Sequence, residues 1–161
     1  MTMIVAGLLS EGALPMYAHI LISTDGSELA QKGVDHGLSL ADENASKVTI
    51  ITVTEPFPVP SISAWGMEGM DPDRLKDANT RHAQAILSAA KAAAEEMGLT
   101  VETLHISNAS PAAAIVDAAK TQGCDLIVMA SHGYRGIKRV LLGSQTAEVV
   151  ATAHIPVLVV H

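Results

Sequence analysis

The stretch DLIVMASHGYRGIKRVLLGSQTAEVVATAHIPVLVV, residues 125–160, contains the pattern that decides the fold. It opens with an apolar run, residues 125–130, and closes with another, residues 156–160. Between them lie a glycine-containing turn and a helical stretch, residues 144–153. Continuous apolar runs are typical of strands covered on both faces, as in parallel sheets, so this stretch predicts a strand–helix–strand unit.

The same alternation runs through the rest of the chain. Further strands are predicted over residues 19–23, 48–53 and 100–106, and further helices over residues 28–42, 72–97 and 111–122. Each helix start has a capping residue, namely Ser27, Asp71 or Ser110, and proline follows the last two at the first helical position. Strands that alternate with helices predict an α/β protein with an open five-stranded parallel sheet between two layers of helices.

The helix predicted over residues 72–97 follows a stretch with no helical or strand period. Residues 55–70, EPFPVPSISAWGMEGM, contain three prolines and two glycines, which predicts a long loop of the kind that often carries function. The buried stripe of the helix is predicted to consist of Leu75, Ala78, Ala85, Ile86, Ala89 and Ala93, with His82 nearby.

The composition excludes several classes of protein. The chain has 161 residues and a hydrophobic content of 48%, which suits a single domain with a full core. Its 17 acidic and 10 basic residues give a formal charge of −7, which argues against binding of DNA or RNA. One Trp, two Tyr and one Phe cannot form a stacking platform for single-stranded nucleic acid. No apolar stretch is long enough to cross a bilayer, so no membrane partner is expected.

Cysteine usage and the N-terminus bear on the compartment. Cys124 is the only cysteine, which excludes an internal disulfide and favours a reducing, cytoplasmic setting. The histidines show no metal-binding spacing, so no metal site is predicted. Residues 1–15 lack a basic leader and predict no signal peptide. We expect them to be an appendage, either disordered or left from cloning, to a single domain over residues 16–161.

Two turns of the predicted sheet are suited to a ligand. In open parallel sheets, ligands bind beyond the carboxyl ends of the strands, where the strand order reverses. One turn there is Asp25-Gly26-Ser27, after the first strand, and the other is residues 131–143, after the fourth. Asp25 is also typical of an ordinary turn and helix cap, so by itself it does not predict a site.

The second turn has the chemistry of an anion site. Gly133 and Gly143 let backbone amides approach a ligand without a side chain in the way. A helix that begins at Ser144 presents the free N–H groups of its first turn, and the hydroxyl groups of Ser131 and Ser144 add donors. The turn is not a Walker A loop, because the chain contains no GxxxxGK[ST] run. His132 has no nucleophile or paired carboxylate beside it, which favours a hydrogen-bonding role over general-base catalysis.

The sequence VMASHGYRGIKRVLLGSQTAEVVATAHIPVLVV resembles the universal stress protein family. The nucleotide-binding signature of that family is G-x2-G-x9-G-[ST]. Its second half is matched by Gly133, nine residues and Gly143-Ser144, whereas Ala130 stands at the position of the first glycine. The segment HILISTDGSELAQKGVDHGLSLA is also similar to the first strand, aspartate and helix of the family, and the resemblance covers residues 17–161.

This resemblance implies a strand order of 3-2-1-4-5, with the site between strands 1 and 4. In ATP-binding members the aspartate after strand 1, here Asp25, lies beside the adenosine, and the backbone at the end of strand 2, here Val53, contacts the adenine. The glycine turn and the [ST] residue hold the ribose and phosphates. The implied nucleotide-binding residues are Asp25, Val53, Ala130, Ser131, His132, Gly133, Gly143, Ser144 and Gln145. The implied ligand is ATP, with AMP or ADP as alternatives and Mg²⁺ held through the phosphates.

The implied function is a regulatory homodimer in the stress response that binds an adenine nucleotide. Slow or no hydrolysis is expected, because no phosphate-loop lysine is present, and the dimer contact is expected at the edge strand Val157–Val160. One alternative is a nucleotide-free stress or scaffold dimer in which the methyl group of Ala130 impairs the site. An ATPase or nucleotidyl-transfer enzyme needs an acid–base or metal constellation that we do not find. A response-regulator receiver needs an acidic pair after strand 1 and a lysine after strand 5, which are missing.

Overall fold

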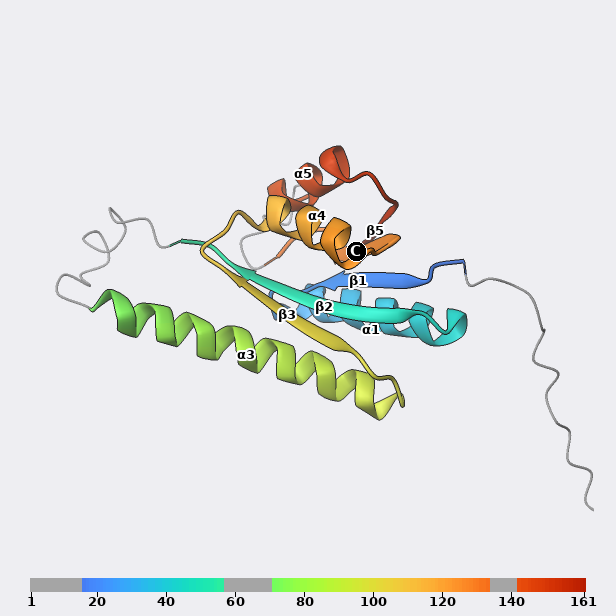
Figure 1. The fold of residues 1–161 in the computed structure, drawn as a ribbon, viewed down its shortest axis with the longest axis horizontal. Helices are drawn as coiled ribbons and strands as arrows, with labels where there is room; N and C mark the ends of the chain where they lie inside the picture. Colours follow the sequence, from blue (N-terminus) through green and yellow to red (C-terminus); the bar gives the residue numbers. More distant parts are fainter. Residues whose placement is uncertain (1–15, 57–70, 134–141) are drawn as a thin grey trace, which may run out of the picture.

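Five parallel strands form the centre of the structure, a computed structural model that describes residues 16–56, 71–133 and 142–161 (Figure 1). The strands are β1 (His19–Ser23), β2 (Lys47–Thr54), β3 (Glu102–Ser107), β4 (Leu126–Ala130) and β5 (Val157–Val160). They lie in the order β3-β2-β1-β4-β5, and every neighbouring pair is parallel. The sheet order that the resemblance implies is therefore confirmed.

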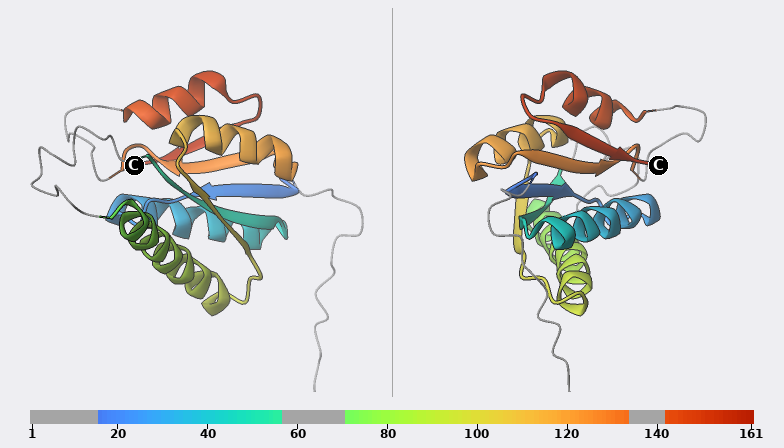
Figure 2. Two further views of the ribbon diagram at one scale, coloured as in Figure 1. Left: turned by 60° about the vertical axis from the view of Figure 1, so that its left-hand side comes forward. Right: turned by 90° about the vertical axis from the view of Figure 1, so that its right-hand side faces the viewer.

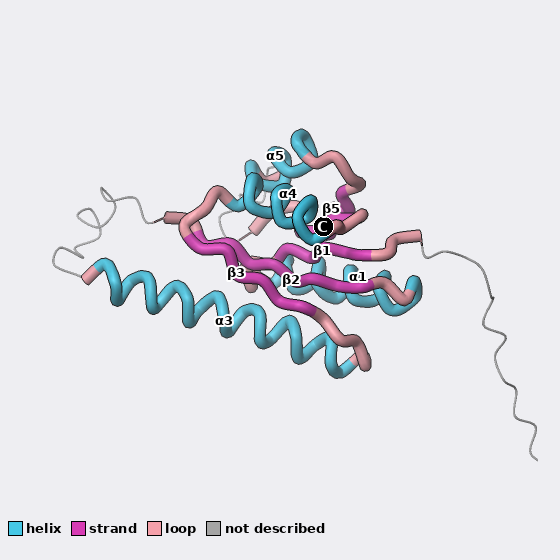
Figure 3. Tube along the Cα trace, viewed as in Figure 1, coloured by secondary structure: helices cyan, strands magenta, loops and turns pink. Residues whose placement is uncertain are grey.

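Helices cover both faces of this sheet. The helices α1 (Glu28–Asn44) and α3 (Pro72–Glu96) lie on one face, and α4 (Pro111–Gln122) and α5 (Ser144–Thr152) lie on the other (Figure 2). Figure 3 shows the strands as a single layer between them. The predicted three-layer α/β architecture is confirmed, and the predicted bounds of these elements agree with the observed ones to within two residues.

The central strands contribute to two hydrophobic cores, because successive side chains of a strand point to opposite faces of the sheet. The core beneath α1 and α3 includes Ile20, Ile22, Val34, Leu38, Val48, Ile50 and Val128. The core beneath α4 and α5 includes Leu21, Ile51, Ile115, Ala119, Ile127 and Val149. Strands that are buried on both faces explain the continuous apolar runs in the sequence.

Side chains hold the starts of α1, α3 and α4, although not always the predicted side chain. Ser27 and Asp71 accept hydrogen bonds from backbone N–H groups in the first turns of α1 and α3, as expected of capping residues. Ser110 occupies the cap position of α4 but makes no side-chain hydrogen bond to the helix. Instead, Oε1 of Gln145 accepts a hydrogen bond of 2.9 Å from the N–H of Ala112. The start of α4 is therefore tied to the first turn of α5.

The predicted buried stripe of α3 is only partly correct. Its buried residues are Ala83, Leu87, Ala90 and Ala94, whereas the predicted Ala78, Ala85 and Ala89 are exposed, as is His82. Leu75, Ile86 and Ala93 are half-buried. Alanine occurs on every side of this helix, so its spacing does not indicate which face contacts the sheet.

A buried histidine lies at the amino end of β1. Nε2 of His19 lies 2.9 Å from Oγ1 of Thr49 on the neighbouring strand, and the His19 side chain is only 7% exposed. Burial, and secondarily the nearby Lys47 ammonium, lowers the pKa of His19 below its ordinary value of 6.5. His19 therefore binds a proton less readily in the folded protein than in the unfolded chain.

The stability of the fold should accordingly fall as the pH drops below the ordinary histidine pKa of 6.5. Below that pH the unfolded chain protonates at His19 and the folded chain does not, so acid favours unfolding. The variant His19→Gln keeps a hydrogen-bonding side chain that cannot ionise. We expect its urea midpoint to fall less than that of the wild type between about pH 7.5 and about pH 5.5. The variant His161→Gln, at an exposed position, is the control, and equal slopes for His19→Gln and wild type would contradict the prediction.

Candidate functional site

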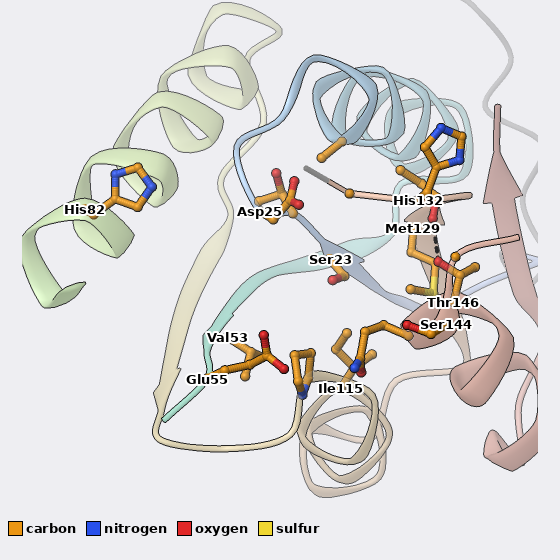
Figure 4. A pocket seen from close by; sticks show the side chains of 17 residues that line it. Ser23, Asp25, Val53, Glu55, His82, Ile115, Met129, His132, Ser144 and Thr146 are labelled. Carbon is orange, nitrogen blue, oxygen red and sulfur yellow. Dashed lines mark hydrogen bonds between the residues drawn. The ribbon is translucent and has the colours of Figure 1, made fainter. Parts of the chain in front are cut away.

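A pocket of about 460 Å³ lies at the carboxyl edge of the sheet (Figure 4). It is lined by the ends of β1, β2 and β4, by one turn of α3, and by the starts of α4 and α5. We call it the edge pocket. Its volume falls within the range of pockets that hold small molecules and cofactors.

The edge pocket brings together all of the predicted site residues except Ser131. The lining includes Asp25, Val53, Ala130, His132, Gly133, Gly143, Ser144 and Gln145. These residues come from four separate parts of the chain, which meet because β1 and β4 are neighbours in the sheet and β2 lies beside β1. The pocket therefore forms at the point where the strand order reverses.

Asp25 has a local role and also faces the glycine turn. Its Oδ1 accepts a hydrogen bond of 3.0 Å from the N–H of Ser27, which is the turn geometry that the sequence suggests. Its other carboxylate oxygen lies against Gly133, so closely that a Cβ atom on Gly133 would overlap it. A side chain at position 133 would therefore displace the Asp25 carboxylate, and glycine keeps the two turns in contact.

The start of α5 is arranged for an acceptor. Gly143 is the cap residue, and its N–H donates a hydrogen bond of 2.7 Å to the carbonyl of Ser131. Within the described part of the chain, the backbone N–H groups of Ser144, Gln145 and Thr146 have no hydrogen-bond partner. Unpaired amides at a helix N-terminus attract anions through hydrogen bonding and the helix dipole.

Space, and not backbone conformation, favours glycine at position 143. Its φ of −65° is accessible to any residue. A Cβ atom there would lie 3.1 Å from Cβ of His132 and 3.2 Å from the carbonyl oxygen of Ser131, which is tighter than ordinary contact. The turn after β4 and the start of α5 therefore pack directly against each other.

Several polar groups beside the edge pocket are used by the protein itself. The hydroxyl of Thr146 donates to the carbonyl of Ala130 at 2.9 Å. The hydroxyl of Ser131 lies 3.1 Å from Nδ1 of His132, and Ser131 is fully buried. The N–H of Ser131 donates to the carbonyl of Val160 at 2.8 Å. Ser131 thus connects the end of β4 to β5 and to the start of α5 through its backbone hydrogen bonds.

Ala130, which replaces the first glycine of the signature, fits its position without strain. It is the last residue of β4, and it is not among the described residues with positive φ. Gly33 of α1 packs behind it, where a Cβ atom would lie 3.4 Å from the backbone N of Ala130. The Ala130 residue is 7% exposed and lines the edge pocket. Ala130 therefore forms part of the pocket wall.

The structure also brings into the lining residues that the sequence analysis missed. Ser23, Met129 and Glu55 stand at or just beyond strand ends, so the rule that ligands bind at the carboxyl edge could have found them. His82 and Ile115 come from the helices α3 and α4. No local sequence signal marks them, because their position depends on how the helices lie on the sheet.

The charges of the described lining are unevenly distributed. It contains the carboxylates of Asp25 and Glu55 and the imidazoles of His82 and His132, and none of its described residues is a lysine or arginine. The basic residues Arg135, Lys138 and Arg139 lie outside the described residues, as do most of the predicted loop 55–70 and the appendage 1–15. The side of the pocket with carboxylates is suited to hydrogen-bond donors of a ligand, and the α5 side is suited to an anion.

Three further observations concern the described residues as a whole. They contain no group of three or more His, Cys, Asp or Glu side chains that could hold a metal ion. Burial raises the pKa of the Cys124 thiol to about 11, so the thiol stays protonated near neutral pH. None of the helices in these residues is both long enough and apolar enough to span a membrane.

Comparisons with known proteins bear on the family and on the fold. A model of the universal stress protein family matches residues 16–161. The universal stress protein MJ0531 of Methanocaldococcus jannaschii is 35% identical over 145 residues, which cover 90% of this chain and 82% of that protein. A solved structure of the protein MJ0577 is 31% identical with a TM-score of 0.75, covering 90% of this chain and 96% of the other. The structure of a universal stress protein in complex with cAMP is 27% identical with a TM-score of 0.64, covering 90% and 97%.

Proposed function

Because this chain belongs to the universal stress protein family, we propose that it binds an adenine nucleotide in the edge pocket. The proposed ligand is ATP, with AMP or ADP as alternatives. One observation carries the proposal: the edge pocket joins the unpaired amides of α5 to Asp25 and Val53 within a single cavity of about 460 Å³. A similar universal stress protein has been solved in complex with cAMP, which supports an adenine nucleotide as the ligand.

The chemistry of the lining suggests how the nucleotide lies. The phosphates bind at the start of α5, where the N–H groups of Ser144, Gln145 and Thr146 and the hydroxyl of Ser144 are available. The Asp25 carboxylate accepts hydrogen bonds from the ribose hydroxyl groups. The adenine lies against the end of β2 at Val53. Mg²⁺ reaches the protein through the phosphates, as is usual for nucleotide sites.

We propose a regulatory role, with slow hydrolysis or none. The described lining contains no lysine, and the chain has no phosphate-loop lysine of the Walker A kind, which favours slow turnover. His132 bonds to Ser131, which favours a positioning role for its ring. The protein then signals through the binding and release of nucleotide, and not through its hydrolysis.

The proposal includes a cytoplasmic homodimer. β5 is an edge strand that pairs only with β4 among the described residues, and its four apolar side chains are half-buried. A bare apolar edge favours pairing with a second strand, and a two-fold axis supplies one from an identical chain. The single cysteine is a buried free thiol, which is compatible with a reducing compartment.

The experiment that tests the proposal is isothermal titration of the ligand-stripped protein with ATP, ADP and AMP. We expect saturable heat for at least one of them, and a thermal shift that grows with ligand concentration. At a ligand concentration of about 100 times Kd, binding stabilises the fold by about 2.7 kcal/mol. The absence of both heat and shift at millimolar ATP would favour the nucleotide-free scaffold dimer.

A further inference from the structure

Thr146 lies in the first turn of α5, and its side chain is buried against the end of β4. The residue is 3% exposed, and its Oγ1 donates a hydrogen bond of 2.9 Å to the carbonyl oxygen of Ala130, the last residue of β4 (Figure 4). We propose that Thr146 is a positioning residue, whose hydroxyl group fixes the direction in which the first turn of α5 presents its N–H groups to the edge pocket. This rests on the proposed function, because it assumes that phosphates bind to those N–H groups.

The other threonines of the described helices use their hydroxyl groups differently. A threonine inside a helix can donate to the carbonyl four residues earlier in the same helix. Within the part of the chain that the structure describes, Thr80, Thr121 and Thr152 each do so, and none of the three is buried. The hydroxyl of Thr146 bonds instead to a strand that ends sixteen residues earlier. It therefore contributes to the position of α5 on the sheet, and not to the hydrogen bonding of the helix itself.

Two hydrogen bonds together attach the start of α5 to the end of β4. Besides the bond of Thr146 to Ala130, the N–H of Gly143 donates to the carbonyl of Ser131, the next residue, at 2.7 Å. Residues three positions apart lie on the same face of a helix, so both bonds attach one face of the first turn. A single bond would let the turn pivot, whereas two bonds set the direction of the helix axis. The free N–H groups of the first turn point along this axis.

The packing of α5 does not supply this direction by itself. Val149, one turn beyond Thr146, is fully buried in the core beneath α4 and α5. Apolar contacts of this kind are not directional, whereas a hydrogen bond requires a particular alignment of donor and acceptor. A valine at position 146 has nearly the shape of threonine and would pack in the same way. The hydroxyl group of Thr146, and not its shape, is then what nucleotide binding depends on.

The variant Thr146→Val tests the proposal, because it keeps the branched shape and the backbone N–H group and removes the hydroxyl. We expect its affinity for ATP in isothermal titration to fall about tenfold, close to the most that one hydrogen bond contributes to an equilibrium. Its affinity for adenosine, measured by competition with ATP, should stay unchanged, because adenosine carries no phosphate. Thr146→Ser keeps a hydroxyl group and should recover most of the affinity for ATP.

The matched control is Thr152→Val, the same substitution in the same helix. Thr152 is exposed, lies outside the edge pocket and donates to the carbonyl of Glu148, so the control should keep the wild-type affinity for ATP. Circular dichroism and thermal melts establish that each variant is folded at the temperature of the titration. A loss of stability is then not mistaken for a loss of affinity. If Thr146→Val does not fold, Thr146→Ala removes the same hydroxyl group and takes its place in the comparison.

The results distinguish this proposal from the proposed function. Wild-type affinity for ATP in the folded Thr146→Val protein would overturn the proposal and leave nucleotide binding intact. An equal loss of affinity for ATP and adenosine would also overturn it, because the hydroxyl group would then maintain the whole pocket and not the direction of the amides. Failure of the wild-type protein to bind ATP would contradict the proposed function, and this proposal with it.

Discussion

Replacement of Gly143 by valine is expected to abolish nucleotide binding while the protein still folds. A Cβ atom at this position would lie only 3.1 Å from Cβ of His132 and 3.2 Å from the carbonyl oxygen of Ser131. Valine adds two methyl groups to that Cβ atom. The turn after β4 must then move away from the start of α5, which separates the two halves of the anion site. We expect a loss of affinity of about a hundredfold or more, or roughly 2.8 kcal/mol, in isothermal titration.

The same substitution should cost some stability, and this has to be measured separately. Overpacking a tight contact destabilises a fold by about 1–3 kcal/mol, which a domain of this size can tolerate. Far-ultraviolet circular dichroism and a thermal melt establish that Gly143→Val is folded. The matched control is Ala151→Val, which introduces valine at an exposed position of α5 outside the edge pocket. A folded Gly143→Val protein with wild-type affinity would count against the assignment of the site.

Replacement of Val159 by aspartate is expected to convert the proposed dimer into monomers. Val159 lies in the middle of β5, opposite Met129 in the register with β4, and is half-buried in the single chain. Pairing of two β5 edges across a two-fold axis would bury an aspartate from each chain without a partner. An unpaired buried charge costs about 3–5 kcal/mol, which weakens association by at least about a hundredfold.

Sedimentation velocity measures this directly. The wild type is expected to sediment with twice the mass of the chain and the Val159→Asp variant with the mass of one chain. The control Val159→Thr keeps the branched shape without the charge and should remain dimeric. A folded Val159→Asp protein that stays dimeric would show that β5 is not the contact.

The fold was predictable because its strands are dense in branched apolar residues and are bounded by turn residues. His19–Ser23, for example, ends at Thr24-Asp25-Gly26-Ser27 and matches the predicted strand at both ends. The buried face of α3 was not predictable, since alanine lies on every side of this helix. The buried residues Ala83 and Ala90 look no different in the sequence from the exposed Ala85 and Ala89.

The candidate site, like the fold, could be predicted from the sequence only in part. The residues at the carboxyl ends of β1 and β4, such as Asp25 and Gly133, could be placed together because the resemblance to the family implies a strand order in which these two strands are neighbours. The contact between Asp25 and Gly133 could not, because it depends on side-chain orientation. The capping of α4 by Gln145, and the arrival of His82 from α3, depend on how the helices pack and have no signal in the local sequence.

The hydrogen bonds of Ser131 have a consequence for regulation. Its N–H donates to Val160 at the end of β5, and its carbonyl accepts from Gly143 at the start of α5. One peptide segment therefore joins the surface where chains would associate to the place where a nucleotide would bind. If these two equilibria are coupled through it, thermodynamic reciprocity requires that each shift the other by the same factor. The cellular ratio of monomers to dimers would then track the supply of nucleotide.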